Sequence, residues 1–340
     1  MRPLCPSHPP ARVLITGGAG FIGSALAREL VERGDDVLAV DDLSCGRPER
    51  LPAGARLRLA DVERPGALAA ALRDEGPFDA LVHLAARVGV RAVLRDPEGC
   101  RRSNLAGARE LVGAVAALPA GRRPRVLAAS SSEVYRDRRA PLREGDPLRS
   151  ETGAGRWAYA GSKLSAERLF DEARRLWSPP RAPLHLRFFN VVGPGQDSDS
   201  GMVLPTFVEH ALAGAPIPVH GDGRQVRTFA HVDEVARVLA ELLARDVPGG
   251  ALNVGGRARA SVLELARAVE RASGSRAGLA FVDPRLRCGA RFEEVPFREP
   301  CLERLAGLGI APPAMGLDAI VRDALARHEV ARSACASPAS

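Results

Sequence analysis

Lysine is almost absent from this chain: of its 48 basic residues one, Lys163, is a lysine, and the others are arginines. Tyrosine and tryptophan are scarce too, with two of each, and aromatic residues make up 4% of the sequence. The basic residues are scattered in pairs such as Arg101-Arg102, without a dense basic run that alternates with aromatic residues, so a nucleic-acid-binding protein is disfavoured. The net charge of +7 suits an anionic ligand that carries phosphates.

Long apolar runs and paired cysteines are also missing. No stretch approaches the roughly 18 apolar residues of a membrane span. The first twelve residues, MRPLCPSHPPAR, are broken by prolines and lack the apolar core of a signal peptide. The six cysteines form no CxxC pair and lie near no histidine cluster, which is typical of free thiols in a reducing compartment. We therefore expect a cytoplasmic globular protein with no metal site and no membrane partner.

Strands and helices alternate through the first half of the sequence. Apolar runs with strand character lie at 12–16, 36–40, 57–60, 80–86, 125–130 and 184–190, and helical periodicity is found at 21–34, 65–74, 103–118 and 159–176. This alternation predicts an α/β fold with a Rossmann-type doubly wound parallel sheet, covered by helices on both faces. Glycine, proline and turns become frequent from about residue 191, which predicts a smaller C-terminal α+β substrate lobe over the carboxyl edge of the sheet.

These patterns divide the chain into two lobes and two tails. Residues 11–190 are predicted to form a dinucleotide-binding lobe. Residues 191–330 are predicted to form the substrate lobe, with some segments returning to the first lobe. Residues 1–10 and 331–340 are predicted to be flexible tails.

A glycine-rich turn follows the first predicted strand. In TGGAGFIG (16–23), Gly17 would make the tight turn, Gly20 would let a pyrophosphate approach the backbone, and Gly23 would let helix and sheet pack closely. The helix that opens at Phe21 and Ile22 would present free N–H groups and a positive dipole end to the phosphates. The context of strand, glycine turn and helix therefore indicates a dinucleotide site.

Acidic residues follow the second and third predicted strands. Asp41 lies 18 residues after Gly23, where a carboxylate grips the ribose hydroxyls of a dinucleotide. An acid at this point repels a 2′-phosphate, so NAD is favoured over NADP. Asp61 would meet the adenine amino group or would only cap the helix that follows, and the sequence does not separate these alternatives.

The single lysine stands four residues after one of the two tyrosines. At this spacing Tyr159 and Lys163 share one face of a predicted helix. We expect the ammonium group to lower the pKa of the phenol from its ordinary value near 10, which would make the phenol a usable general base. Lys163 would also hold the nicotinamide ribose. The alternative interpretation is a chance pair on an amphipathic helix.

Six motifs follow one another along the chain: TGGAGFIG, HLAA (83–86), NLAGARELV (104–112), SSSEVY (130–135), Tyr159-x-x-x-Lys163 and RFFNVVGP (187–194). Together they resemble the extended short-chain dehydrogenase/reductase family, in its nucleotide-sugar epimerase/dehydratase branch. The resemblance covers about residues 12–325. It implies bound NAD, a nucleotide-sugar substrate, a homodimer, and cofactor contacts from Leu84, Ala85 and Ala86.

The same resemblance implies a reaction that begins by oxidising sugar C4 to a 4-keto intermediate. Ser131 would hydrogen-bond the reacting sugar oxygen. The 4,6-dehydratases of the branch carry an Asp-Glu pair where this chain has Ser132 and Glu133, so dehydration is disfavoured. With Arg227, these two residues resemble the Ser-Glu-Arg set of UDP-glucuronate decarboxylases. We narrowly favour decarboxylation, with a nucleotide-sugar 4-epimerase as the close alternative and a non-catalytic dinucleotide-binding regulator as a remote one.

The remaining substrate contacts implied by the resemblance lie in the second half of the chain. Asn190 would hold a substrate phosphate. Arg227, in GDGRQVRTFAHVDEVA (221–236), would contact the diphosphate or the sugar, and Arg298 would add a second phosphate clamp. Lone arginines in so arginine-rich a chain are usually surface charges, and the surrounding motif favours Arg227 over Arg298.

Overall fold

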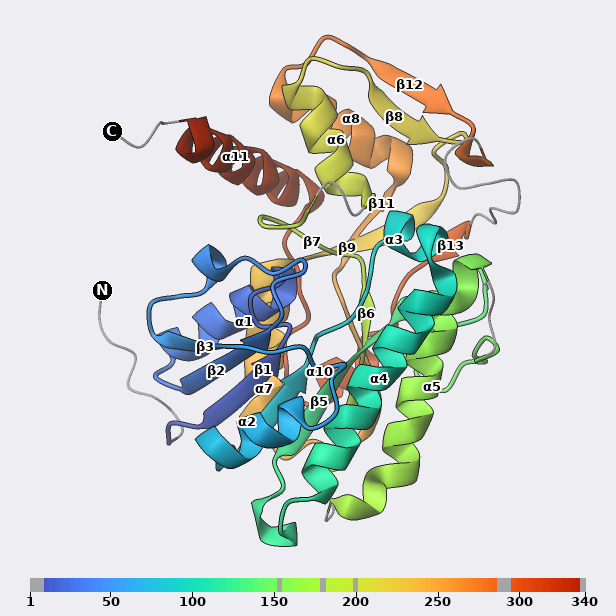
Figure 1. The fold of residues 1–340 in the computed structure, drawn as a ribbon. Coiled ribbons are helices and arrows are strands. Elements are labelled where there is room, and N and C mark those ends of the chain that lie inside the picture. Colours follow the sequence, from blue (N-terminus) through green and yellow to red (C-terminus); the bar gives the residue numbers. More distant parts are fainter. Residues whose placement is uncertain (1–8, 152–154, 178–181, 198–200, 286–294, 337–340) are drawn as a thin grey trace.

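The computed structural model describes residues 9–151, 155–177, 182–197, 201–285 and 295–336, so most of the predicted N-terminal tail lies outside the described residues. Its largest sheet has seven parallel strands in the order β10-β6-β5-β4-β1-β2-β3 (Figure 1). The strands are β1 (Arg12–Thr16), β2 (Asp36–Asp41), β3 (Ala55–Leu59), β4 (Ala80–His83), β5 (Arg125–Ser131), β6 (Leu184–Phe189) and β10 (Gly250–Gly255). This arrangement confirms the predicted Rossmann-type sheet.

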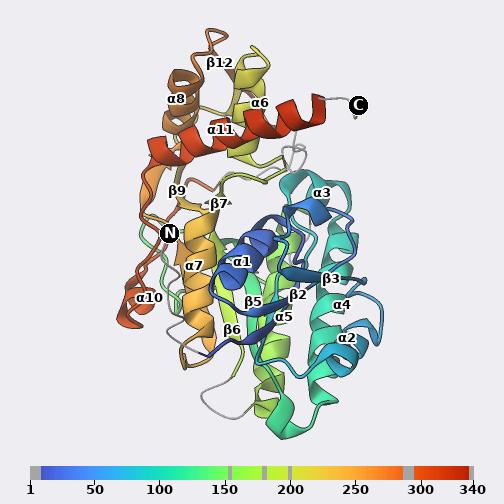
Figure 2. The same cartoon turned by 90° about the vertical axis from the view of Figure 1, so that its left-hand side faces the viewer.

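Helices cover both faces of this sheet (Figure 2). On one face α1 (Phe21–Glu32) packs against α7 (Val232–Leu243); on the other, α4 (Pro97–Ala116) lies between α2 (Ala67–Glu75) and α5 (Ala158–Glu172). Side chains alternate along each strand, so that the apolar run of β1 feeds both layers: Val13 and Ile15 join the core under α1, and Leu14 joins the core under α4.

Three elements differ from their predicted bounds by three residues or more at one end. The predicted strand 80–86 ends at His83 because the chain then leaves the sheet. The predicted helix 103–118 begins earlier, at Pro97, because the side chain of Asp96 caps it by accepting a hydrogen bond from Gly99 N at 2.8 Å. The short helix α3 (Val90–Arg95), which precedes it, was not predicted. The helix of residues 159–176 ends at Glu172 and continues as a 3-10 turn over Ala173–Leu176.

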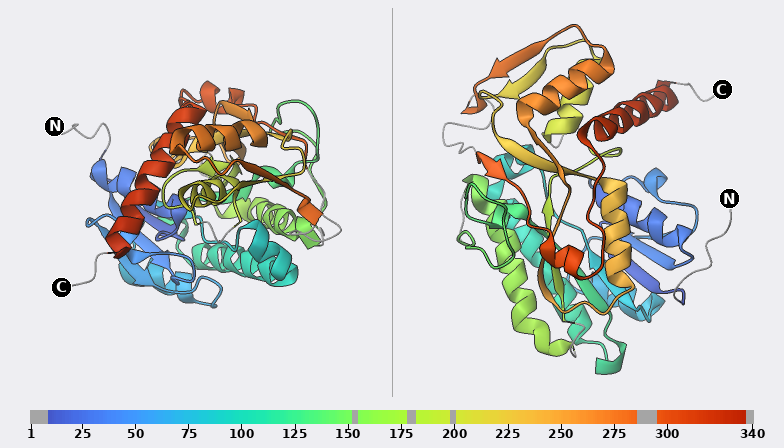
Figure 3. Two further views of the ribbon diagram at one scale, coloured as in Figure 1. Left: turned by 90° about the horizontal axis from the view of Figure 1, so that it is seen from above. Right: turned by 180° about the vertical axis from the view of Figure 1, so that it is seen from behind.

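The second half of the chain builds a smaller α+β lobe, as predicted, and also completes the first. Both β10 and α7 return to the large lobe, and α7 lies along the back of the sheet (Figure 3, right). The smaller lobe contains β7 (Val191–Val192), β8 (Ile217–His220), β9 (Val226–His231), β11 (Ala258–Ser261), β12 (Leu279–Val282), β13 (Phe297–Arg298), α6 (Val203–Leu212), α8 (Val262–Ser273) and α11 (Leu317–Ala336).

Within that lobe, β9 pairs with β7, β11 and β13, while β8 pairs with β12. Helices α6, α8 and α11 pack against one another around a separate apolar core. Helix α11 continues to Ala336, into the segment predicted to be a tail. The short helix α10 (Glu303–Gly307) packs against β10. Every helix in the described residues is too short or too polar to cross a membrane.

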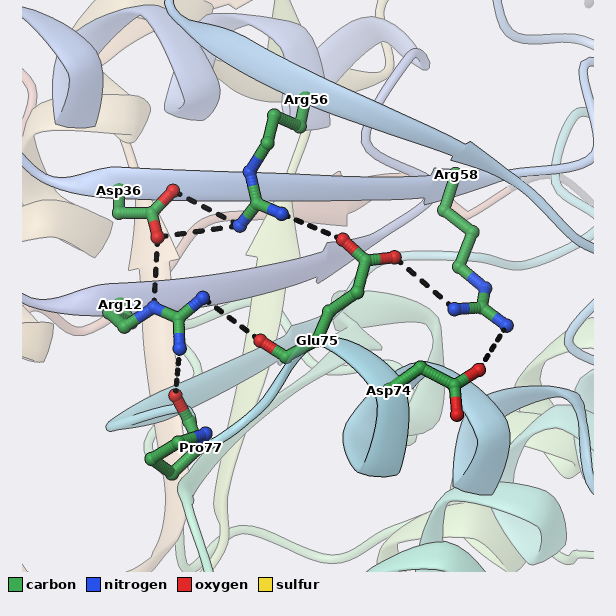
Figure 4. Close-up of polar contacts among 7 residues, drawn as sticks. All are labelled: Arg12, Asp36, Arg56, Arg58, Asp74, Glu75 and Pro77. Carbon is green, nitrogen blue, oxygen red and sulfur yellow. Dashed lines mark hydrogen bonds and ion pairs between the residues drawn. The ribbon is translucent and has the colours of Figure 1, made fainter.

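An ion-pair network joins the amino ends of β1, β2 and β3 to the end of α2 (Figure 4). Arg12 and Arg56 both contact Asp36, with shortest distances of 2.8 and 3.2 Å, and Arg56 also contacts Glu75 at 2.7 Å. The hydrogen bond from Arg12 holds the pKa of Asp36 below its ordinary value. Exposed pairs of this kind each contribute about 1 kcal/mol or less. They lie at the edge of the sheet opposite the carboxyl ends of the strands, where the site residues gather.

Candidate active site

Tyr159 and Lys163 lie together in the first turns of α5. The Nζ atom of Lys163 is 5.8 Å from the centroid of the Tyr159 ring. Lys163 is 5% exposed, whereas part of the Tyr159 surface remains open. Within the described residues, Nζ has no hydrogen-bond or ion-pair partner. Nζ is not among the fully buried side-chain atoms that lack a partner, so it can donate to an acceptor from a ligand, such as the hydroxyls of a ribose.

Ser131 reaches the same point from the carboxyl end of β5. Its hydroxyl lies near enough to the phenol of Tyr159 to lower the pKa of that phenol, and it accepts a hydrogen bond from Glu133 N at 3.2 Å. Ser132 is buried in the 3-10 turn Ser132–Val134, which continues directly from β5. The structure thus brings Ser131, Tyr159 and Lys163 together, with Glu133 beside them.

Burial governs the protonation of this group. It raises the pKa of Tyr159 above its ordinary value, and the charge of Glu133 raises it further, while the hydrogen bond from Ser131 opposes both. Burial also lowers the pKa of Lys163, to about 8. The pKa of Tyr159 in the chain alone therefore departs from its ordinary value in the direction opposite to the expected one, because burial of the phenolate is the largest influence on it.

Asn104 on α4 connects the loop after β4 to α5, the helix that carries Tyr159 and Lys163. Its Oδ1 accepts a hydrogen bond from Arg87 N at 2.8 Å, and its Nδ2 donates to Ser162 Oγ at 3.0 Å. Asn104 is 5% exposed. Asn104 opens the motif NLAGARELV, but no role was predicted for it. A polar residue on the inner face of a long helix was a usable signal.

His83 and Cys100 complete the buried surroundings of the lysine. The Nδ1 atom of His83 is 2.8 Å from Thr16 Oγ1. Burial, and then the charge of Lys163, lower the pKa of His83 to about 3, so its ring is neutral at physiological pH. Cys100 Sγ donates to Arg87 O at 3.3 Å. Burial raises the pKa of this thiol, which keeps it protonated and neutral. Because His83 and Cys100 are both neutral, the positive charge among these three side chains is that of Lys163.

The glycine turn forms a cradle with the shape that a pyrophosphate needs. Gly17 has a φ of +68°, and a Cβ there would lie 2.7 Å from Ala85 N. A Cβ on Gly23 would lie 2.1 Å from Gly17 O, so the helix could not approach the turn with any larger residue. Gly20 precedes the first turn of α1, which no side chain of the described residues caps. The N–H groups of Phe21 and Ile22 are therefore left for a ligand.

The chain after β4 runs directly over this turn. Leu84 N donates to Thr16 O at 3.0 Å, and Ala85 N donates to Thr16 Oγ1 at 3.4 Å. Leu84, Ala85 and Ala86 are all partly exposed. The predicted cofactor residues of both segments thus lie beside one another at the carboxyl edge of the sheet.

Asp41 and Asp61 have different local roles. Asp41 is 7% exposed and braces the glycine turn, since its Oδ2 accepts from Ala19 N at 3.0 Å while its Oδ1 accepts from Leu43 N at 2.9 Å. Each carboxylate oxygen retains a second lone pair for a ribose hydroxyl. Asp61 accepts from Glu63 N at 2.8 Å, which closes a turn ahead of α2 and does not cap that helix, because its N-cap is Gly66. The contact of Asp61 with adenine stays a prediction.

The three predicted substrate residues lie on different segments: Asn190 between β6 and β7, Arg227 on β9 and Arg298 on β13. Asn190, with a φ of +35°, donates from Nδ2 to Thr228 O at 2.9 Å and so ties the end of β6 to β9. Arg227 and Arg298 are register partners on β9 and β13, so both project from the same face of that sheet. The Nη1 atom of Arg298 lies 3.4 Å from Glu133 Oε1. Glu133 thus contacts Arg298, and the grouping of Ser132, Glu133 and Arg227 stays a prediction.

Comparison with known proteins gives consistent results. The family model "NAD dependent epimerase/dehydratase family" matches residues 13–255. The chain is 31% identical over 299 residues to a UDP-N-acetyl-alpha-D-glucosaminuronate decarboxylase of Bacillus cytotoxicus (86% of this chain, 90% of the relative). It is 32% identical over 339 residues to a UDP-glucose 4-epimerase of Azospirillum brasilense (92% and 91%). The crystal structure of Thermus thermophilus UDP-glucose 4-epimerase in complex with NAD superposes with a TM-score of 0.79 at 26% identity (94% and 99%).

Proposed function

The chain belongs to the NAD-dependent epimerase/dehydratase family, with NAD as its cofactor, and on that premise we propose that it decarboxylates a nucleotide sugar acid of the UDP-glucuronate type. Four features of the site suit NAD: the glycine cradle, the uncapped first turn of α1, Asp41, and the Nζ atom of Lys163. Bound NAD supplies a hydride acceptor and, in its oxidised form, a positive charge. Relatives named as a decarboxylase and as a 4-epimerase support an enzyme of this kind.

The environment of Arg298 is the observation that favours an acidic sugar. The residue is 6% exposed, its Nη1 meets Glu133 at the long distance of 3.4 Å, and its Nη2 has no hydrogen-bond partner within the described residues. Arg149 and Arg156 add positive potential, since their charges help to lower the pKa of Arg298. A buried guanidinium nitrogen without an acceptor is costly. A sugar carboxylate at this point would satisfy it.

The same geometry supports a division of labour among the chain's own groups. The Tyr159 phenolate would accept the proton of the C4 hydroxyl, and Ser131 would hold that oxygen by a hydrogen bond. Lys163, and the positive charge of the oxidised cofactor, would offset the burial that raises the pKa of the phenol. Once C4 is a ketone, the neighbouring C5 carries a β-keto carboxylate, and Arg298 would orient that carboxylate for loss of carbon dioxide.

The proposed function is tested with purified protein, NAD and UDP-glucuronate in D₂O, followed by NMR. Decarboxylation replaces the carboxylate at C5 by hydrogen from the solvent. We therefore expect carbon dioxide and a nucleotide pentose that carries deuterium at C5. An acidic product epimerised at C4, without deuterium and without carbon dioxide, would identify the chain as a 4-epimerase instead. Lack of turnover of UDP-glucuronate, UDP-glucose and UDP-N-acetylglucosamine alike would overturn both assignments.

The 4-epimerase is retained as a second candidate because the Azospirillum relative with that name is matched along 92% of this chain. Homodimer formation and a cytoplasmic location stay predictions. They have no bearing on the chemistry above, since the residues proposed for it all come from one chain.

A further inference from the structure

A row of buried polar side chains crosses the large sheet beside the candidate active site. Ser130 on β5, Arg187 on β6 and Asn253 on β10 are register partners on neighbouring parallel strands. Their exposed fractions are 4%, 3% and 0%. Register partners project from the same face of a parallel sheet, and we call these three residues the polar row. Buried polar groups cost free energy unless they are hydrogen-bonded, so the partners of the row show which elements it joins.

At one end, the polar row is joined to α5. Ser130 Oγ donates to Glu167 Oε1 at 2.5 Å, while Arg187 donates from Nε and Nη2 to the two oxygens of the same carboxylate at 3.0 and 2.7 Å. Glu167 lies on α5 one turn after Lys163. Ser130 immediately precedes Ser131 on β5. The hydrogen bonds of this carboxylate therefore fix the position of α5, which carries Lys163, relative to β5, which carries Ser131.

At the other end, the polar row is joined to the segment that carries Arg298. Tyr135 donates its hydroxyl to Asn253 Oδ1 at 2.6 Å. The Nδ2 atom of Asn253 donates to Leu142 O at 2.8 Å and to Cys301 O at 3.2 Å. Cys301 is three residues after Arg298. Burial raises the pKa of Tyr135 to about 12, so its hydroxyl remains a donor throughout the physiological range.

The centre of the row joins these two ends. The guanidinium of Arg187 lies 4.8 Å from the centroid of the Tyr135 ring, and its Nη1 donates to Glu144 O at 2.9 Å. The carboxylate of Glu144 in turn accepts from Asn253 N at 3.0 Å. One continuous set of hydrogen bonds and ring contacts thus runs from α5 across three strands to the chain beyond β13.

We propose that the polar row is a positioning device, which holds Tyr159 and Lys163 at one end and Arg298 at the other in a fixed relation to Ser131. A buried ion pair adds little to stability, because apolar side chains of similar size often replace it without loss. Proton transfer, in contrast, depends on placing the reacting atoms to within a fraction of an ångström. Four residues act as positioning residues, because each affects a site residue through a neighbour and not by touching substrate: Glu167, Arg187, Tyr135 and Asn253.

Lys163 provides a direct readout of the first end of the row. Its ammonium group faces Glu167 and Tyr159 on its own helix, Cys100 on α4 and His83 on β4. The charge of Glu167 raises the pKa of Lys163 against the opposing effect of burial. Because the chain has a single lysine, protein labelled with ¹³C-lysine gives one Cε signal, and its titration needs no assignment.

The first experiment titrates that signal in three proteins, without cofactor or substrate. The wild type is expected to titrate near pH 8. Glu167→Gln removes the facing charge, so its midpoint should move to lower pH by about half a unit. Glu172→Gln makes the same change at an exposed position at the end of α5 and should match the wild type. Equal midpoints in all three proteins would overturn the proposed link between Glu167 and Lys163.

The second experiment separates positioning from stability by measuring turnover, the Michaelis constant and the thermal midpoint. Tyr135→Phe removes one hydroxyl and keeps the ring. We expect kcat to fall roughly tenfold or more, with the Michaelis constant nearly unchanged. The double variant Glu167→Leu/Arg187→Leu should retain a thermal midpoint close to that of the wild type and yet lose a similar or larger factor in kcat. Wild-type kcat in both variants would show that the row serves folding alone and would overturn the inference.

The turnover experiment rests on the proposed function, whereas the lysine titration does not. If the wild type converts no nucleotide sugar, the proposed function fails. The inference is then decided by the lysine titration together with the thermal midpoint of the double variant. If the wild type is active and the variants equal it, the inference fails and the proposed function stands.

Discussion

Tyr159→Phe is expected to lose about a thousandfold in kcat, the range that removal of a positioned general base usually costs. The substitution deletes a single oxygen, and Ser131 and Glu133 both influence the pKa of the hydroxyl that carries it. The ring retains its contacts in the first turn of α5, so folding and NAD binding should be preserved. The measurement is single-turnover kinetics with UDP-glucuronate on NAD-loaded protein, combined with the thermal midpoint.

The control for this variant is Glu172→Gln, on the same helix and exposed, which should keep the wild-type rate. A Tyr159→Phe protein that remained within about tenfold of the wild type would show that a different group removes the proton. Loss of NAD binding in the variant would make the phenol a binding group, which would also contradict the role assigned to it.

Arg298→Met is expected to remove the preference for an acidic sugar. The buried guanidinium has a free Nη2 and only a long contact with Glu133, so a sugar carboxylate would gain charge-assisted hydrogen bonds from it. Losing such bonds from a buried site costs about 2–5 kcal/mol. The ratio of the dissociation constants for UDP-glucose and UDP-glucuronate should therefore fall about a hundredfold. Calorimetric titration of NAD-loaded protein with both ligands measures this ratio.

Two further variants make the Arg298 result interpretable. The double variant Arg298→Met/Glu133→Gln avoids leaving a carboxylate without its partner, and it should show the same change in the ratio. Arg227→Met tests the register neighbour of Arg298 and should weaken both ligands alike, because the resemblance assigns that arginine to the diphosphate or the sugar. Equal losses for the acidic and the neutral ligand in Arg298→Met would contradict the assignment of a carboxylate to this arginine.

Local sequence patterns predicted the parts of the site that depend on local structure. The glycine turn between β1 and α1 follows from spacing alone, as does the placement of Tyr159 and Lys163 on one helix face. The sheet follows from the alternation of apolar strands and amphipathic helices. The return of β10 to this sheet had no local signal, since a short apolar run such as GALNVG gives no indication of which sheet it will join.

The remaining parts of the site depend on contacts between distant segments. Glu133 and Arg298 are 165 residues apart, so no local pattern could have shown that these two side chains meet. The polar row is invisible in the sequence because Ser130, Arg187 and Asn253 become neighbours only through strand register. The pKa of Tyr159 was predicted in the wrong direction because spacing shows the nearby charge of Lys163 but not the burial that opposes it.

The proposed reaction depends on transfer of hydrogen between sugar C4 and the bound dinucleotide, driven by the Tyr159 phenolate. It is tested most directly with UDP-glucuronate that carries deuterium at C4, by comparing the turnover rate with that of the unlabelled substrate and analysing the product by NMR. We expect slower turnover of the labelled substrate and a product that retains deuterium at C4, because the same hydrogen leaves and returns within one closed site. Loss of the label to the solvent, or product formed without any C4–hydrogen bond being broken, would contradict it.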